Sequence, residues 1–188
     1  MESAHGLLQE RGLRGFTIEE VAARSGAAKT TIYRAWPNRG VLAVESFLWA
    51  MAPRLAYPDV PSAIDSVRRQ LLLVVRAFRG SAGVTMSGLI AEAQLDPQTA
   101  KFLLERYVLP RRAEAARVLR QGIEQGELRP DLDLDIAIDL LYGPLYYRLL
   151  VKHRPLDATF IDKVLEGALH GIAGPGKARR QASRQPRP

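Results

Sequence analysis

The chain has 188 residues, 47% of them apolar, and a formal net charge of +7 at pH 7. That length and apolar content are sufficient for one helical body with a small module attached. Cysteine is absent, which excludes disulfide bonds, thiolate metal sites and thiol nucleophiles. The sequence has no run of about eighteen apolar residues and no signal peptide, so membrane insertion and export are not expected and a cytoplasmic location is predicted.

Much of the positive charge lies close to the carboxyl-terminal end. Residues 177–188 contain five cations and no acid, which leaves a formal charge of only about +2 for the rest of the chain. Residues 174–188 are expected to form a disordered basic tail, because they carry no periodic apolar positions. The high net charge is accordingly only weak support for DNA binding.

Residues 16–49 predict a helix-turn-helix followed by a supporting third helix. The first helix is expected to begin at Thr17, whose hydroxyl would cap it, while Glu20 would complete a capping box. Gly26 falls where the chain must reverse. Glycine suits this place, because it enters the left-handed region without strain. The second helix is expected from about Ala28 to Trp36.

Cations and hydroxyls on the second helix indicate a DNA-binding surface. Between Arg24 and Arg39 the chain carries four cations and no acid, and a phosphate backbone attracts such a surface through counterion release. A solvated surface helix could carry the same charges, but the helical spacing around Gly26 favours DNA. Asn38 is expected to cap the next helix and to form a second phosphate clamp with Arg39. The predicted DNA-binding residues are Thr17, Lys29, Thr30, Thr31, Tyr33, Arg34, Asn38 and Arg39.

This block resembles the amino-terminal domain of the TetR (tetracycline-repressor) family of transcriptional regulators. The matching residues are ERG at 10–12, FT at 16–17, EVA at 20–22, Gly26, TIY at 31–33, Trp36 and Asn38-Arg39. The resemblance implies a dimer, with Lys29 and Thr30 near base edges and with Thr31, Tyr33 and Arg39 at phosphates. Ala35 and Glu19 depart from the family pattern, so the operator sequence is not transferable.

The start of the chain also departs from that pattern. Family members usually carry a longer first helix after a basic arm, whereas only nine residues precede Glu10 here. Ala4, Leu7 and Leu8 keep an apolar helical face of about two and a half turns, which is marginal without docking. Two explanations stay open: a start codon assigned late, or a shortened and weaker DNA-binding domain.

The rest of the chain is expected to be helical apart from a proline-containing connector at 50–61. Apolar residues recur at spacings of three and four, as in amphipathic helices. Pro110 is expected to kink or split the longest of them. The predicted helices are one from Ser62 to Arg79, a shorter one that ends before Asp96, one from Asp96 toward Gly126, one from about Leu134 to Lys152, and one from about Asp157 to Ile172.

The carboxyl-terminal part resembles a subgroup of the same family, through GELRPDLD at 126–133 and GPLYYRLL at 143–150. The resemblance implies an effector domain whose helices enclose a cavity, and tyrosine hydroxyls there could meet a polar group of a ligand. The same side chains could equally be plain core or lie at a dimer interface. The predicted ligand-binding residues are Met86, Leu89, Phe102, Tyr107, Tyr142 and Tyr146.

The last two predicted helices carry wide apolar faces that one helical domain would not cover fully. Pairing with the same helices of a second chain would form a four-helix bundle around a twofold axis. Two recognition helices would then be placed to read a palindrome. The predicted dimerisation residues are Leu141, Leu145, Leu149, Phe160, Val164 and Ala168.

The sequence thus predicts an all-α protein with a helix-turn-helix domain at 1–49, a connector at 50–61, and an effector-binding and dimerisation domain at 62–173. Three scattered histidines and the absence of a GxSxG or phosphate-loop motif argue against an enzyme, a metal site or a cofactor. The predicted function is a ligand-responsive regulator, expected to be a repressor. It would bind a palindromic operator in double-stranded DNA as a homodimer and be released by a small-molecule effector. The alternative is a constitutive architectural DNA-binding protein without an effector, which would leave the helical body unexplained.

Overall fold

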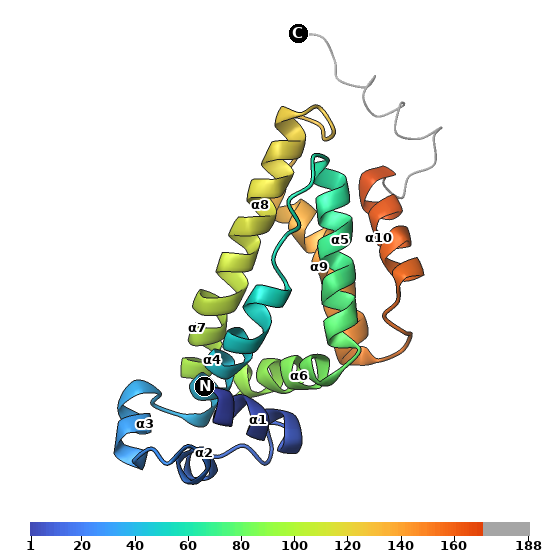
Figure 1. Cartoon of the computed structure of the whole chain (residues 1–188). Helices are drawn as coiled ribbons and strands as arrows, with labels where there is room; N and C mark the ends of the chain where they lie inside the picture. The colour runs from blue at the N-terminus through green and yellow to red at the C-terminus, as the bar shows by residue number, and fades with distance from the viewer. Residues whose placement is uncertain (171–188) are drawn as a thin grey trace.

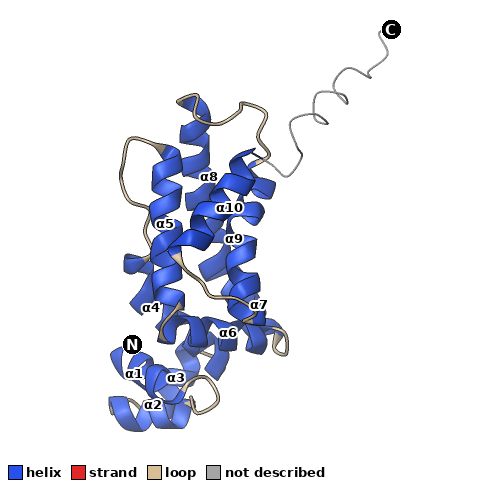
Figure 2. Ribbon diagram, turned by 90° about the vertical axis from the view of Figure 1, so that its right-hand side faces the viewer, coloured by secondary structure: helices blue, strands red, loops and turns tan. Residues whose placement is uncertain are grey.

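A computed structural model describes residues 1–170, over which the chain consists of helices and turns without a strand (Figures 1 and 2). The all-α class is therefore confirmed. The predicted tail and the last two residues of the predicted final helix lie outside the described residues. The elements in order are α1 (Glu2–Arg11), α2 (Ile18–Ser25), α3 (Lys29–Ala35), α4 (Arg39–Met51), the short η1 (Ala52–Arg54), α5 (Ala63–Phe78), α6 (Ser81–Ala93), α7 (Pro97–Leu103), η2 (Leu104–Val108), α8 (Leu109–Glu124), α9 (Leu134–Val151) and α10 (Ala158–His170).

Helices α1 to α3 form a small head, in which α1 packs on α4 (Figure 1). The short first helix is held there by Ala4, Leu7 and Leu8, all buried. A helix of this length is marginal in isolation, so its docking on α2 and α4 is what stabilises it.

The helix-turn-helix has the expected boundaries but only half of the expected capping box. The Thr17 hydroxyl accepts a hydrogen bond from the Glu20 amide at 3.2 Å, and Gly26 ends α2 in the left-handed conformation with φ of 71°. The Glu20 carboxylate pairs with Arg11 at 2.9 Å. The reciprocal bond to the Thr17 amide was predicted, and the salt bridge to α1 replaces it.

Helices α5, α8, α9 and α10 form the body, each packed on at least two of the others, so that they surround one core. Helix α6 crosses one end of this bundle and contacts α5 and α9 on one side and α1 and α4 of the head on the other (Figure 1). The head is therefore attached to the body through α4, α6 and α7. None of the helices within residues 1–170 has the length and apolar character that crossing a bilayer would require.

The long helix through Pro110 continues where the sequence predicted a kink or a split. Helix α7 runs into η2, a turn of π-helix, and η2 runs directly into α8, in which Pro110 lies in the first turn. Proline lacks an amide hydrogen, and its ring clashes with the carbonyl one turn earlier. The wider π-helical turn relieves that clash, and such turns occur often at functional sites.

Glu127 connects the predicted polar turn after α8 to the start of α5. Its carboxylate accepts hydrogen bonds from the Ser62 hydroxyl and the Ile64 amide, each at 3.0 Å, and from the Ala63 amide at 3.3 Å. Free amides and the helix dipole make this an attractive place for an anion. The acid in the GELRPDLD segment thus fixes one end of the bundle.

Candidate DNA-binding head and effector cavity

The exposed side of α3 carries the predicted DNA-reading side chains. Ile32 is the residue of α3 that is buried, and it anchors the helix to the head. Lys29 and Arg34 form no ion pair within residues 1–170, so both charges are available to a phosphate backbone. The predicted contacts that the structure brings together on this exposed side are Lys29, Thr30, Thr31, Tyr33 and Arg34.

Two further predicted contacts have partners inside the head. The Tyr33 hydroxyl donates to Glu19 at 3.3 Å, and the charge of Glu19 raises the pKa of Tyr33. A phosphate would therefore compete with Glu19 for this hydroxyl. The Thr17 oxygen accepts the Glu20 amide but retains a proton that it can donate to a phosphate.

Fewer cations are free for DNA in the head than the sequence predicted. Both terminal nitrogens of Arg24 donate to the Glu10 carboxylate at 2.7 Å, a paired arrangement that lowers the pKa of Glu10. This pair joins α1 to α2 and neutralises one of the four cations counted between Arg24 and Arg39. Exposure of both partners keeps the stabilisation small.

Asn38 and Arg39 lie at the junction between the head and the body. The side-chain oxygen Oδ1 of Asn38 caps α4, as predicted, and accepts a hydrogen bond from the Val41 amide at 2.8 Å. Its side-chain amide donates to Asp96 at 2.8 Å and to Gln98 at 3.2 Å. The predicted phosphate clamp thus has, in this structure, protein partners at the N-cap and in the first turn of α7.

Arg39 forms the second polar connection of this junction. Its Nε donates to one oxygen of Glu92 at 3.1 Å and its Nη2 to the other at 3.0 Å, which is a bidentate pair. The Arg39 side chain is 41% exposed and that of Glu92 is 21% exposed. Any contact between Arg39 and DNA would therefore compete with Glu92.

A close approach of α4 to α7 completes the junction. A Cβ atom on Gly40 would lie 2.0 Å from the Thr99 hydroxyl oxygen, so only glycine allows this contact. Thr99 is fully buried, and its amide and hydroxyl both bond to Asp96, which lowers the pKa of Asp96. Sequence reasoning placed Asp96 at the start of a helix but missed Gly40, Glu92 and Thr99. Their contacts across the junction join residues more than fifty positions apart in the chain.

The body contains a cavity of about 110 Å³ between η2 and α8 on one side and α9 on the other. Three of the predicted ligand-binding residues line it: Tyr107, Tyr142 and Tyr146. Ligand pockets usually measure about 300–1,000 Å³, so a ligand larger than a few atoms would have to displace these side chains. The lining residues that sequence reasoning missed are Val108, Arg111, Arg112 and Ile138.

Tyrosine hydroxyls at the cavity are connected through hydrogen bonds. Tyr142 donates to the buried Gln70 at 2.6 Å and also bonds to the Tyr57 hydroxyl, while Tyr107 and Tyr146 share a bond of 3.1 Å. Burial raises the pKa of Tyr57 to about 12 and raises the pKa values of the other three tyrosines. All four hydroxyls are therefore neutral near pH 7, and a ligand would exchange one of these hydrogen bonds for a bond to itself.

Arg111 supplies a partly buried positive charge at the same cavity. Its side chain is 19% exposed and pairs with Glu114 at 2.7 Å, and its second terminal nitrogen donates to the Leu55 carbonyl. A guanidinium has five N–H donors, so unused donors can meet an acceptor group of a ligand. The lining is thus apolar with donors on two sides.

The structure does not bring the other three predicted ligand-binding residues to this cavity. Met86 and Leu89 are fully buried core residues of α6, and Phe102 lies beneath the Arg106 guanidinium at 5.9 Å. Their spacing is that of a buried helix face, so periodicity alone could not distinguish core from cavity. These assignments are corrected to core packing and, for Phe102, to a partly buried contact.

The dimerisation residues predicted on α9 also require correction. Leu141, Leu145 and Leu149 are buried in the core of the same chain, with Leu145 completely inaccessible, and Phe160 on α10 is buried beneath Arg148. Val164 and Ala168 are partly buried. The chain's own bundle thus covers Leu141, Leu145, Leu149 and Phe160, whereas Val164 and Ala168 on α10 keep part of their surface accessible.

A different face of α9 remains exposed. Ile136, Leu140, Tyr147 and Val151 are each more than half exposed and follow one another at spacings of four, seven and four residues, which places them in one stripe. Gly143 lies within the stripe and has open space above it. The apolar face of α9 that could meet a second chain is therefore this stripe.

Comparison with known proteins identifies the family to which this chain belongs. Residues 1–45 match the family model of bacterial regulatory proteins of the tetR family, and residues 57–168 match the tetracyclin repressor-like C-terminal domain. The chain belongs to the tetracycline-repressor family of transcriptional regulators. The resemblance stated for both ends of the sequence is confirmed.

Relatives of this TetR-family chain are described as regulators. YdeS of Bacillus subtilis (strain 168), an uncharacterised HTH-type transcriptional regulator, is 33% identical over 172 residues, covering 92% of this chain and 87% of YdeS. The DNA-binding transcriptional repressor TetR of Mycobacteroides abscessus is 26% identical over 169 residues, covering 88% and 87% of the two chains. These relatives are transcriptional regulators by description and not enzymes.

Solved structures agree with this assignment. The TetR family transcription regulator SCO0332 superimposes with a TM-score of 0.83 at 34% identity, covering 92% of this chain and 95% of that one. FadR from Bacillus subtilis, solved in complex with stearoyl-CoA, superimposes with a TM-score of 0.68 over 92% of this chain and 97% of FadR. At 16% identity the second likeness concerns the fold alone.

Proposed function

We propose that the protein is a ligand-responsive repressor that binds a palindromic operator as a homodimer and leaves it when a small molecule occupies the tyrosine cavity. The exposed, unpaired Lys29 and Arg34 on α3 support DNA contact. An operator-binding protein acts where the DNA is, so we place it in the cytoplasm.

One observation carries the ligand response: a continuous helical segment connects the head to the cavity. Asp96 and Thr99, which hold Asn38, lie at the start of α7, and Tyr107, which lines the cavity, lies in η2 directly after α7. Tyr107 lies eight positions after Thr99, which corresponds to only about 12 Å of helix. A ligand that displaces Tyr107 would therefore move the segment that fixes the head.

The cavity's small volume supports the same proposal. A ligand that needs more than about 110 Å³ must favour a conformer in which the tyrosines have moved. A ligand changes an equilibrium only through such differential affinity for two conformers. The π-helical turn is a suitable place for the movement, because its hydrogen bonding is less regular than that of an α-helix.

For the dimer, we propose that the exposed stripe on α9 pairs with the same stripe of a second copy. An isologous contact of this kind is self-complementary around a twofold axis. It would place two copies of α3 to read two half-sites about one turn of DNA apart, or a multiple of it. TetR-family membership of both halves of the chain supports this arrangement.

Selection of bound duplexes from a random pool tests the proposed operator. We expect enrichment of a palindrome whose half-sites are separated by a whole number of helical turns. Arg34→Ala serves as a binding-deficient comparison. Retention of all sequences with equal affinity would contradict the repressor proposal and favour the alternative, a constitutive architectural DNA-binding protein.

A compound screen on the isolated operator complex tests the effector. An authentic effector should lower operator affinity, and Tyr142→Phe should weaken its binding because a polar hydroxyl is lost from the cavity wall. Leu95→Ala provides a matched control, because this leucine is exposed in the turn after α6, away from the cavity. A compound that releases DNA equally from both variants would not act through the cavity.

A further inference from the structure

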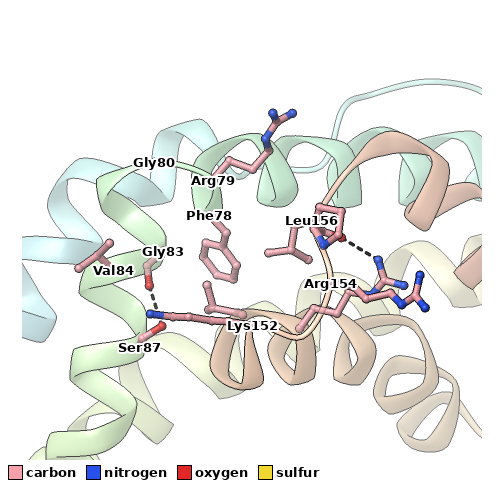
Figure 3. Close-up of a pocket in the computed structure, with 12 residues that line it drawn as sticks. Phe78, Arg79, Gly80, Gly83, Val84, Ser87, Lys152, Arg154 and Leu156 are labelled. Carbon is pink, nitrogen blue, oxygen red and sulfur yellow. Dashed lines mark hydrogen bonds between the residues drawn. The ribbon is translucent and has the colours of Figure 1, made fainter.

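A second and larger hollow lies at the other side of the body, where the α5–α6 turn faces the carboxyl-terminal end of α9 (Figure 3). Its volume is about 310 Å³, within the range usual for ligand pockets. It shares no lining residue with the tyrosine cavity. This hollow, which we call the basic pocket, has no role in the proposed repressor mechanism.

Positive charge dominates the basic pocket. Arg79, Arg148, Lys152 and Arg154 line it, and no acidic side chain within residues 1–170 does so. Arg79, Lys152 and Arg154 form no ion pair among these residues. These three side chains extend from the rim in different directions (Figure 3), and because they are exposed each can turn toward an anion in the pocket.

Lys152 has a backbone conformation that is usual for glycine and unusual for lysine. Lys152 ends α9 with φ of 57°, and within residues 1–170 no other non-glycine residue has a positive φ. Glycine is the usual residue at such a helix end, because a Cβ atom is disfavoured there by about 1 kcal/mol. The chain instead carries a lysine whose side chain extends along the pocket toward Ser87 and Gly83 (Figure 3).

Arg148 holds the loop that carries Arg154. Its guanidinium lies 3.6 Å from the centre of the Phe160 ring and donates to the Pro155 carbonyl at 2.7 Å. The loop from α9 to α10 is thereby fixed across the mouth of the pocket. Arg148 acts as a structural residue here, while Arg79, Lys152 and Arg154 have donors free for a ligand.

The remaining wall of the pocket is apolar. Phe78 and Leu149 are buried core residues that reach it, and Leu156 covers it from the α9–α10 loop. Gly83 allows α6 to start close against the end of α5, because a Cβ atom there would lie 2.0 Å from the Phe78 carbonyl oxygen. The pocket therefore offers an apolar surface beside a group of cations.

We propose that the basic pocket binds a small organic phosphate. Guanidinium groups match phosphate geometry through paired N–H donors, and the lysine adds a point charge. Arg79, Lys152 and Arg154 would turn toward the phosphate at the rim, and the organic part would cover Phe78 and Leu156. This site is additional to the tyrosine cavity and does not depend on it.

Isothermal titration of the full chain with phenyl phosphate, inorganic phosphate and phenol at constant ionic strength tests the proposal. Phenyl phosphate should bind once per chain, inorganic phosphate about tenfold more weakly, and phenol not measurably. Loss of one charge-assisted hydrogen bond corresponds to a factor of roughly ten to one hundred. Equal affinity for phenyl phosphate and phenol, or absence of phenyl phosphate binding, would overturn the proposal.

Variants localise the binding. Lys152→Gln with Arg154→Gln should weaken phenyl phosphate at least about tenfold, whereas Arg117→Gln with Arg120→Gln, which removes two exposed cations from α8, should leave it unchanged. Equal losses in both pairs would show diffuse charge attraction and overturn the site.

A third variant separates binding from folding. Lys152→Gly should maintain or raise the melting temperature, because glycine adopts the left-handed conformation freely, and should still lower the affinity for phenyl phosphate. Unchanged phosphate affinity in this variant would contradict the role of Lys152. If the Lys152→Gln, Arg154→Gln pair lost duplex affinity but kept phenyl phosphate binding, these cations would be DNA contacts and the proposal would fail.

Discussion

The chemistry of each cation in the head depends on the partner that the fold gives it. Arg24 and Arg39 have the same side chain as Arg34, but each is engaged by a carboxylate on another helix. Lys29 and Arg34 have no such partner within residues 1–170. Charge alone therefore does not rank these residues as DNA contacts.

We predict that Arg34→Ala lowers affinity for duplexes of any sequence and that Lys29→Ala also changes the preferred sequence. Each lost phosphate contact should reduce the slope of log affinity against log salt by about one. Arg24→Ala is the matched control and should change this slope less, because its charge is compensated by Glu10. A larger slope change for Arg24→Ala than for Arg34→Ala would reverse this ranking.

Alkaline pH should destabilise the body through the buried tyrosines. Tyr57 titrates near pH 10 when unfolded and at about 12 in the fold, so the folded chain retains a proton that the unfolded chain releases. Its contribution is fully present below about pH 10 and is lost as the pH rises toward 12. The two-unit difference corresponds to at most about 2.7 kcal/mol.

Urea unfolding measured across this pH range tests whether the free energy of unfolding falls as the pH rises. The free energy of unfolding should fall with rising pH, and Tyr57→Phe should show a smaller decline, since the other cavity tyrosines still contribute. A free energy that stays constant to about pH 12 would show that the hydroxyls are solvated in solution.

Local sequence signals were sufficient for the ends of the helices. Thr17 and Asn38 cap the helices that they were predicted to cap, because each cap requires only a residue three positions away. Ser62, Asp96 and Asp157 cap the helices that were predicted to begin at them, for the same reason. Partners distant in sequence, such as Glu92 for Arg39, carry no signal of this kind. The junction between head and body was therefore not predicted.

The orientation of α9 was not predictable from its own sequence, because the helix is apolar on both sides. Leucines at 141, 145 and 149 and the stripe that begins at Ile136 have equally good helical periodicity. Contacts with α5, α8 and α10 decide which face is covered, and those are properties of the whole bundle. The cavity tyrosines were found because polar hydroxyls on an apolar helix are unusual.

Substitutions on the two faces of α9 should have different effects. Leu140→Glu with Tyr147→Glu should yield a folded monomer, because the charges would enter the proposed interface at a cost of several kcal/mol per uncompensated ion. Leu145→Glu should unfold the chain, since this side chain is completely buried. Sedimentation together with circular dichroism distinguishes the two results.

Leu95→Glu controls for charge alone, because Leu95 is 84% exposed in the turn after α6. It should leave both assembly and helix content unchanged. A dimer that persists in the Leu140→Glu, Tyr147→Glu variant would exclude the α9 stripe as the interface.

At the scale of the whole molecule, Arg39 has two possible roles at the junction between head and body. The guanidinium is predicted to reach a DNA phosphate, yet it forms a bidentate pair with Glu92 on α6. An exposed pair of this kind contributes about 0–1 kcal/mol, so DNA could compete for it. When Glu92 is neutralised, operator binding should weaken if the pair attaches the head and should tighten if Arg39 is a phosphate contact.

We predict that the pair acts mainly as the attachment of the head, so that Arg39→Gln and Glu92→Gln each weaken operator binding about two- to fivefold. The double variant should be no weaker than either single variant, because residues that act through one contact are not additive. Hydrogen exchange of α1 to α3 should rise to a similar extent in all three, since a less firmly attached head opens more often. If Glu92→Gln instead tightened binding and steepened the salt dependence by about one, with Arg39→Gln reversing both effects, Arg39 would be a phosphate contact that Glu92 restrains.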